Sequence, residues 1–295
     1  MRGAARAVLS GFIDYAGLFP PASQSMQDAV RSYAAYRFRP DGWALGRFVV
    51  PASRLPEWEE AIADLPTDSG RGAWPLSCLL GPNRADDLAA IAAFRDRNAD
   101  GTASLTAMEA KVETASDVQW LRSRVDSATE LYLEVPRDGT APVVSILEPI
   151  QQAGAYAKIR TGGVRADEIP PPGLILRFLE EVARRKVPFK ATAGLHHPVR
   201  RVAPLTYAPG APSALMFGYL NVVLAATVLW AGRPADEAER LLLAQNPATL
   251  TIGDASLCWE GLPVSVEEIA RARREFMRSI GSCSFTEPVE EIPAT

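Results

Sequence analysis

The chain is poor in lysine, cysteine and histidine. Of its 31 basic residues only four are lysines, Lys111, Lys158, Lys186 and Lys190, so arginine supplies nearly all of the positive charge. The three cysteines, at positions 78, 258 and 283, are far apart and lack the spacing of a metal site. An odd number of isolated cysteines argues against a disulfide framework and indicates a reducing compartment. We therefore expect a cytoplasmic protein.

An excess of positive charge and a convincing membrane segment are also missing. The 31 basic and 35 acidic residues give a formal net charge of −4, which argues against a nucleic-acid partner. The only membrane-like run, Ala214–Trp230, is at the lower limit of the length that spans a bilayer, and it contains Asn221 and Thr227. It predicts a buried helix that packs on the protein or forms a homo-oligomer interface. No small-residue cleavage site of a signal peptide follows the N-terminus.

Short apolar segments alternate with longer helical patterns along the whole chain. The expected strands are Gly11–Gly17, Gly46–Val50, Leu76–Leu80, Leu105–Val112, Leu131–Val135, Ala157–Thr161, Pro188–Thr192 and Thr249–Gly253. Eight strands, each followed by a helix, predict a single (β/α)₈ barrel domain, the TIM-barrel fold, over residues 1–295. A doubly wound open sheet is the alternative, although no G-x-G-x-x-G sequence opens a helix.

Two segments depart from the regular repeat. A helical insertion is expected at about 193–248, with one helix over Ser213–Trp230 and a second over Pro234–Gln245. The last helix is expected over Ser265–Ile280, where Ser265 and Glu268 form a capping box. An acidic C-terminal tail covers residues 282–295.

The expected strands place ionisable side chains on the face opposite their apolar side chains. Because successive strand residues point to opposite faces, this set would gather on the barrel axis, near the ends of the strands. Its members are Asp14, Glu109, Lys111, Glu134, Lys158, Arg160 and Lys190. A mutually neutralising core network is one explanation, because buried ions need partners. However, arginine pairs better with carboxylates than lysine does, and lysine is preferred where a neutral amine must act.

Four segments resemble a known enzyme family. Residues 157–163 read AKIRTGG and residues 189–194 read FKATAG. The pair resembles the two lysine strands of class I, Schiff-base aldolases of the deoxyribose-phosphate aldolase type. Residues 13–22 resemble the first strand of that family, and residues 252–256 resemble its glycine-rich, phosphate-binding strand end. The resemblance implies a barrel enzyme that forms an imine with its substrate.

The resemblance also implies roles for individual residues. Lys158 would attack the carbonyl group, Lys190 would lower the pKa of Lys158, and Glu109 or Asp14 would relay protons. Gly162, Gly163 and Gly194 would offer amides to an anionic group. Glu134 and Arg160 either hold the substrate or neutralise each other. The complete set of candidates for substrate binding is Glu134, Arg160, Thr161, Gly162, Gly163, Thr192, Gly194, His196, His197, Gly253 and Ser256.

Two departures from that family change the expected substrate. Gly194 is followed by Leu195 and the two histidines rather than by a second glycine, and Asp254 would repel a phosphate dianion. A phosphorylated sugar is therefore in doubt. At most one of His196 and His197 should face a pocket, because neighbours in an extended loop point apart; the alternative is a pair of surface-loop residues. Adjacent histidines rarely chelate one ion, so we expect no metal site there.

Three hypotheses follow for the function. The first is a Schiff-base lyase or aldolase that acts on a small carbonyl compound and uses no cofactor. The second is a magnesium-dependent barrel lyase or isomerase, with Asp14, Glu109 and Glu134 as ligands. The third is a barrel that has lost catalysis and serves in binding.

Overall fold

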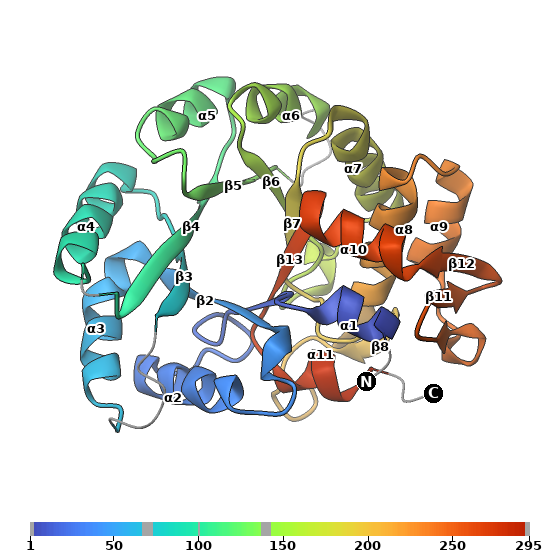
Figure 1. Ribbon diagram of the computed structural model, residues 1–295, viewed down its shortest axis with the longest axis horizontal. Coiled ribbons are helices and arrows are strands. Elements are labelled where there is room, and N and C mark those ends of the chain that lie inside the picture. Colours follow the sequence, from blue (N-terminus) through green and yellow to red (C-terminus); the bar gives the residue numbers. More distant parts are fainter. Residues whose placement is uncertain (1–2, 67–72, 100, 137–142, 293–295) are drawn as a thin grey trace.

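Eight parallel strands form the centre of the computed structural model, which describes residues 3–66, 73–99, 101–136 and 143–292. The strands are β1 (Ile13–Tyr15), β2 (Leu45–Pro51), β3 (Trp74–Leu79), β4 (Ala103–Lys111), β5 (Glu130–Glu134), β6 (Tyr156–Arg160), β7 (Phe189–Thr192) and β13 (Met277–Ser282). They close into a barrel in the order β1-β13-β7-β6-β5-β4-β3-β2. Helices surround this ring (Figure 1). The predicted (β/α)₈ barrel is confirmed.

The outer layer consists of the helices that connect the strands. They are α2 (Met26–Arg37), α3 (Leu55–Ala63), α4 (Arg84–Arg97), α5 (Ala115–Arg122), α6 (Val143–Gln152), α7 (Pro172–Arg185), α8 (Tyr219–Trp230), α9 (Ala235–Leu243) and α10 (Val266–Glu275). Several start at side-chain caps that the sequence encodes. Ser25 accepts a hydrogen bond from the Asp28 amide at the start of α2, and Ser265 and Glu268 form the predicted capping box of α10. Such caps satisfy amides that the first turn of a helix leaves unpaired.

The predicted position of the eighth barrel strand, Thr249–Gly253, is wrong. Residues 251–252 form β10 (Thr251–Ile252), which lies in a separate antiparallel sheet with β11 (Ser256–Trp259) and β12 (Leu262–Ser265). The barrel is closed instead by β13, whose residues the helical pattern assigns to the end of the last helix. That helix ends at Glu275, and β13 pairs with β1 on one side and β7 on the other. Both candidate segments are short and apolar, so only their pairing partners distinguish them.

The start predicted for the helix Ser213–Trp230 is wrong. Residues 213–216 form β9 (Ser213–Met216), which pairs antiparallel with β8 (Arg201–Pro204), and α8 begins at Tyr219. Every residue of α8 from Tyr219 to Val228 is buried, and the helix packs against α7, α9 and α10 within the chain. Its polar Asn221 is satisfied there, because its amide nitrogen donates to the carbonyl oxygens of Leu241 and Ala244. No described helix is long and apolar enough to cross a membrane.

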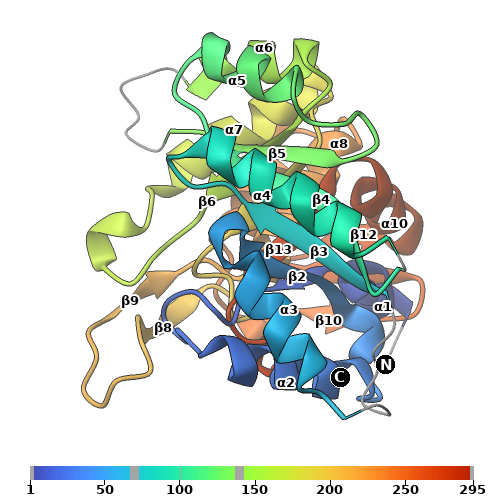
Figure 2. The same ribbon diagram turned by 90° about the vertical axis from the view of Figure 1, so that its left-hand side faces the viewer.

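The two ends of the barrel carry different additions. The three-stranded sheet packs on α1 (Gly3–Leu9), which precedes β1 and therefore lies at the N-terminal end of the barrel strands. The β8–β9 hairpin follows β7 and lies at the opposite end, as the side view in Figure 2 shows. The chain then finishes with α11 (Thr286–Glu290), where the Tyr219 hydroxyl donates to the Pro288 carbonyl. Residues 293–295 of the expected acidic tail lie outside the described residues.

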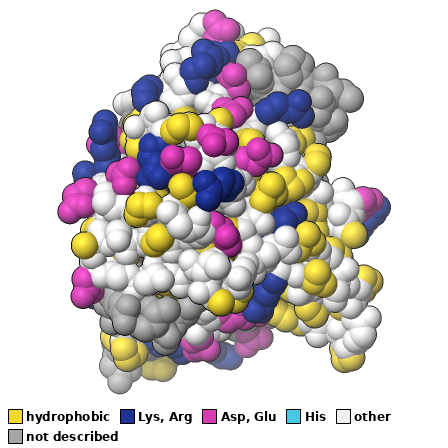
Figure 3. Space-filling view, turned by 90° about the vertical axis from the view of Figure 1, so that its right-hand side faces the viewer, with side chains coloured by type: hydrophobic (Ala, Val, Ile, Leu, Met, Phe, Trp, Pro, Cys, Tyr) yellow, Lys and Arg dark blue, Asp and Glu magenta, His cyan; other side chains and the backbone are white. Residues whose placement is uncertain are grey.

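Short 3₁₀-helices and a mixed surface complete the fold. The 3₁₀-helices are η1 (Gly42–Ala44), η2 (Ala52–Arg54), η3 (Ala166–Glu168) and η4 (Pro247–Thr249). On the face shown in Figure 3, basic and acidic side chains lie interspersed with apolar ones.

Candidate functional site

A cavity of about 340 Å³ lies at the C-terminal end of the barrel strands. Its walls come from β2, β3, β4, β6, β7 and β13 and from the segments that follow β1, β6, β7 and β13. The polar or charged lining residues are Glu109, Lys158, Arg160, Glu168, Lys190, Thr192, His196 and Cys283. The loop after β1 adds Phe19, Pro20 and Pro21 to the wall. This is the end at which (β/α)₈ enzymes carry their active sites.

Lys158 lies at the cavity between two carboxylates. Its Nζ is 2.8 Å from Glu109 Oε2 and 3.0 Å from Glu134 Oε2, and 7% of its side chain is exposed. Glu134, Lys158 and Lys190 occupy directly paired positions on β5, β6 and β7. The expectation that these three residues and Glu109 converge on the axis is confirmed.

Lys190 lies deeper, where its side chain is 0% exposed. Its Nζ donates to Asp14 Oδ2 at 2.6 Å and to Glu109 Oε1 at 2.7 Å, and it lies 5.2 Å from the centre of the Tyr132 ring. Glu109 therefore bridges the two lysines, with one carboxylate oxygen on each. Lys111 takes no part in this cluster, because its side chain is exposed at the end of β4.

The ion pairs determine the protonation of this cluster. Burial alone would raise the pKa of Glu109, but Lys158 and Lys190 hold it far below its usual range. Burial alone would lower the pKa of Lys158, but Glu109 and Glu134 raise it above its usual value. The expectation that the pKa of Lys158 lies below its usual value is therefore wrong for this structure, because the two adjacent carboxylates outweigh burial.

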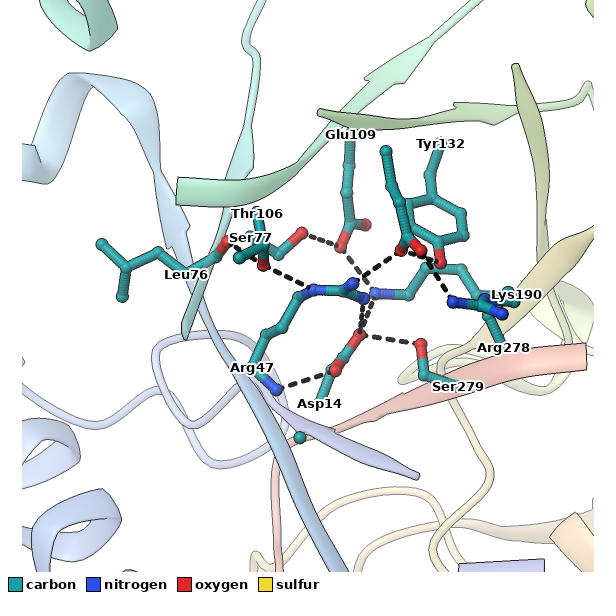
Figure 4. A network of polar contacts seen from close by, with 12 residues as sticks. Asp14, Arg47, Leu76, Ser77, Thr106, Glu109, Tyr132, Lys190, Arg278 and Ser279 are labelled. Carbon is teal, nitrogen blue, oxygen red and sulfur yellow. Dashed lines mark hydrogen bonds and ion pairs between the residues drawn. The ribbon is translucent and has the colours of Figure 1, made fainter. Parts of the chain in front are cut away.

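The charge network continues to the other end of the barrel (Figure 4). Asp14 accepts hydrogen bonds from Ser279 Oγ at 2.8 Å and from the Arg47 amide at 2.9 Å. The Arg47 guanidinium pairs with Glu130 at 2.6 Å, and Arg278 pairs with the other oxygen of Glu130 at 2.9 Å. Sequence reasoning missed Arg47, Glu130 and Arg278 altogether.

Irregular strand pairing occurs where these two arginines lie. Ile13 and Tyr15 of β1 pair with Leu45 and Phe48 of β2, so β2 has one extra residue in the segment that contains Arg47. In the same way β13 has an extra residue at Arg278 against β7, and β4 has one at Thr106 against β3. Such bulges break strict alternation and re-aim side chains. The Arg47 Nε donates to Thr106 Oγ1 at 2.9 Å, so two of the bulged segments meet directly.

Arg160 and Thr192 also line the cavity, at directly paired positions of β6 and β7. The alternative that Glu134 neutralises Arg160 is not realised among the described residues, where Glu134 pairs with Lys158.

Two of the glycines predicted to bind an anion, Gly162 and Gly194, allow the loops after β6 and β7 to pack closely together. A Cβ atom on Gly162 would lie 3.2 Å from the Gly194 Cα, and Gly194 has a φ of +79°, which favours glycine. Thr161 strengthens this contact, because its hydroxyl donates to the Ala193 carbonyl at 2.7 Å. The loops after β6 and β7 are thus held at the cavity by close backbone packing.

An internal carboxylate fills the anion-binding position of the loop after β6. Glu168 Oε2 accepts hydrogen bonds from the amides of Val164 at 2.8 Å and Arg165 at 3.2 Å. A Cβ atom on Gly163 would lie only 2.0 Å from the same oxygen, so glycine makes room for it. The amides that follow Gly163 thus already bind an anion of the protein itself, and the role expected for the amides of Gly162, Gly163 and Gly194 stays a prediction.

The two histidines point to different places. His196 lines the cavity, with its Nδ1 3.4 Å from Ser282 Oγ. Burial lowers the pKa of His196 to about 4, and the neighbouring His197 contributes, so His196 is neutral at pH 7. His197 instead contacts Glu291 through its Nδ1 at 2.8 Å. Only the first of the two is placed for contact with a ligand in the cavity.

Gly253 and Ser256 lie away from the cavity, contrary to the prediction. Their backbones hydrogen-bond to each other at the turn between β10 and β11, and the Gly253 carbonyl accepts from the Ala4 amide of α1. Asp254 accepts from the Gly3 amide, so its carboxylate caps α1 at the far end of the barrel. The incorrect eighth strand is the cause of this error.

The carboxylates proposed as magnesium ligands are kept apart by lysines. Lys158 lies between Glu109 and Glu134, and Lys190 lies between Glu109 and Asp14. Across the described ranges, no three side chains of histidine, cysteine, aspartate or glutamate are grouped in a way that could hold a metal ion. This donor set does not fit the oxygen-rich shell that magnesium requires.

The arrangement combines a reactive group with space for a small molecule. A primary amine, the Glu109 carboxylate beside it and a guanidinium all border one cavity, and Glu134 contacts the same amine. Comparison with models of protein families and with curated proteins finds no match to this chain.

Proposed function

We propose that the protein is a Schiff-base lyase, similar to an aldolase, that acts on a small carbonyl compound. The observation that supports this most is the position of Lys158, whose amine borders the cavity between two carboxylates. The resemblance of the two lysine strands to Schiff-base aldolases of the deoxyribose-phosphate type agrees with this proposal.

Lys158 is the better nucleophile of the two central lysines. Lys190 is wholly buried and is held by Asp14 and Glu109 beside the Tyr132 ring. Lys158 retains some exposure and lies on β6 just below the mouth of the cavity. Lys190 then has a supporting role, because it holds one oxygen of Glu109 and so directs the other oxygen at Lys158.

The amine must lose a proton before it can attack. Glu134 and Glu109 lie within hydrogen-bond distance of Nζ and can accept that proton. The neutral amine then forms a C–N bond to the carbonyl carbon. The carbonyl oxygen takes up two protons, one from the attacking nitrogen and one from the carboxyl group that had accepted the ammonium proton, and leaves as water. The resulting protonated imine carries the same single positive charge as the original ammonium. The positive charge therefore stays beside both carboxylates, although the single N–H of the iminium can hydrogen-bond to only one of them. The iminium can accept the electron pair of a breaking C–C bond.

The alternative is a barrel without catalysis, because a fully paired network also stabilises a core. Reductive trapping distinguishes the two. Wild-type protein is incubated with aldehydes, ketones and 2-oxo acids, reduced with borohydride and analysed by mass spectrometry. We expect an adduct on Lys158 that is absent from Lys158→Met and from Lys158→Arg, which keeps the positive charge but supplies no reactive amine.

The matched control is Lys111→Met, because Lys111 is exposed on the neighbouring part of the barrel end. This variant should be trapped as readily as the wild type. An adduct that maps to Lys111 or Lys190, equal trapping in Lys158→Arg, or no adduct with any carbonyl compound would contradict the proposed function.

A further inference from the structure

Arg160 and Thr192 form a second layer above the two central lysines. Arg160 follows Lys158 by two residues on β6, and Thr192 follows Lys190 by two residues on β7. Residues two apart on a strand share a face and lie about 6–7 Å apart along it. All four side chains line the same cavity, so the Arg160 and Thr192 layer is the one nearer its mouth.

In the described part of the chain, each side chain of this layer has one polar atom that is buried without a partner. Neither Arg160 Nε nor Thr192 Oγ1 has a hydrogen bond. A buried donor left unpaired is costly, so such atoms are expected to meet a ligand or water. The other arginines of the barrel interior behave differently, because Arg47 and Arg278 both pair with Glu130.

No neighbouring anion of the described chain satisfies Arg160. Glu109 and Glu134 are bound by lysines, and Glu168 accepts hydrogen bonds from the backbone of its own loop. Imine formation keeps the positive charge of Lys158 beside Glu109 and Glu134, so neither carboxylate is left without a cation. Within the described residues no anion is left for Arg160, which leaves the ligand as its source.

We propose that Arg160 and Thr192 bind the carboxylate of the substrate, and that the carbonyl compound is a 2-oxo acid. This inference rests on the proposed function, because Lys158 fixes where the carbonyl carbon lies. In a 2-oxo acid the carboxylate is bonded directly to that carbon, which places it one layer above Lys158. A guanidinium and a hydroxyl are suited to a planar carboxylate.

The test uses oxamate, which has the shape and charge of a small 2-oxo acid but an amide that forms no imine. Oxamide is its neutral counterpart. By titration calorimetry, oxamate should bind the wild type and oxamide should not. Binding should weaken about tenfold or more in Arg160→Met and measurably in Thr192→Val, because a charged hydrogen-bond partner is lost. Arg165→Met is the control, because Arg165 is exposed in the next loop and pairs with Asp167.

The outcomes separate this inference from the proposed function. Absence of oxamate binding, equal binding of oxamide, or unchanged binding in Arg160→Met would overturn the carboxylate site, even if a carbonyl compound is trapped on Lys158. Arg160-dependent binding of oxamate without any trapping would overturn the lyase and leave the carboxylate site standing. If the wild type traps pyruvate in preference to acetone, and Arg160→Met traps less pyruvate, the result would support both the lyase and the carboxylate site.

Discussion

At the residue scale, Glu109 is the most connected group of the site. Its two oxygens accept from different lysines, and Oε1 also accepts from the Ser77 hydroxyl at 2.8 Å. All of these partners are buried, so no solvent competes for the carboxylate. One side chain thereby fixes the separation of two cations that would otherwise repel each other.

The first prediction concerns the acid stability that Glu109 provides. Its depressed pKa means that its contribution is fully present above the unfolded pKa of about 4.3 and declines as the pH falls below it. Glu109→Gln should lower the free energy of unfolding at pH 7 by about 3 kcal/mol or more, because both ammonium groups lose a partner. The difference from wild type should shrink at pH 3, as measured by urea unfolding.

Glu60→Gln provides the comparison, because Glu60 is exposed on α3. The free energy of unfolding of this variant should match that of the wild type at both pH values. A Glu109→Gln variant as stable as wild type at pH 7, or a difference that does not change with pH, would contradict the assigned role.

At the element scale, strict alternation along strands explains what could be predicted from the sequence. A period of two correctly placed Glu109, Glu134, Lys158 and Lys190 on the axis, because β5, β6 and β7 pair in register there. The rule did not reach Arg278, because its segment was expected to be helical, or Arg47, which lies at a register shift of β2. A bulge is a property of two strands together, so one strand's sequence does not reveal it.

The prediction of the eighth strand was wrong for a related physical reason. The segments 249–253 and 277–282 have similar length and apolar content, and a capped helix pattern runs into the second one. Which of them enters the barrel depends on contacts with β1 and β7, and the first segment is held instead by β11 and α1. The predicted fold class was nevertheless correct, because the number of βα units is the same whichever of the two segments forms the last strand.

The second prediction concerns the close packing of β2 on β1. A Cβ atom on Gly46 would lie 2.5 Å from Asp14 Oδ1, and Asp14 is fixed by Lys190 and Ser279. Gly46→Ala should therefore lower the free energy of unfolding by about 1–3 kcal/mol through overpacking, as measured by thermal or urea unfolding. Gly173→Ala is the control: its added methyl meets no atom within 4 Å, and α7 favours alanine. Equal stability of both variants would show that Asp14 can move freely.

At the scale of the whole molecule, alternating charges run from one end of the barrel to the other. In order from the cavity they are Glu134, Lys158, Glu109, Lys190, Asp14, Arg47, Glu130 and Arg278. Within this series, Lys158 and Lys190 lie at the cavity end, and Arg47 and Arg278 lie at the far end. This division agrees with their chemistry, because arginine pairs rigidly with carboxylates while lysine can give up its proton. Direct ion pairs thus connect the end that holds the proposed nucleophile to the end that holds Arg47 and Arg278.

The last prediction tests that division with two glutamates of one strand. Glu130 and Glu134 are the first and last residues of β5, and each is paired with cations. Glu134→Gln removes a carboxylate that raises the Lys158 pKa, so more neutral amine exists at a given pH. The midpoint of the pH profile for borohydride trapping should move down by about one unit.

Glu130→Gln should leave that midpoint unchanged, because Glu130 contacts Arg47, Arg278 and the Tyr132 hydroxyl rather than Lys158. It should instead lower the free energy of unfolding by about 3–5 kcal/mol, because two guanidinium groups lose their carboxylate. Trapping profiles measured from pH 5 to 10, alongside urea unfolding of both variants, give the comparison. Equal shifts of the trapping midpoint in the two variants would mean that the charges act as one unit, with no separate reactive end.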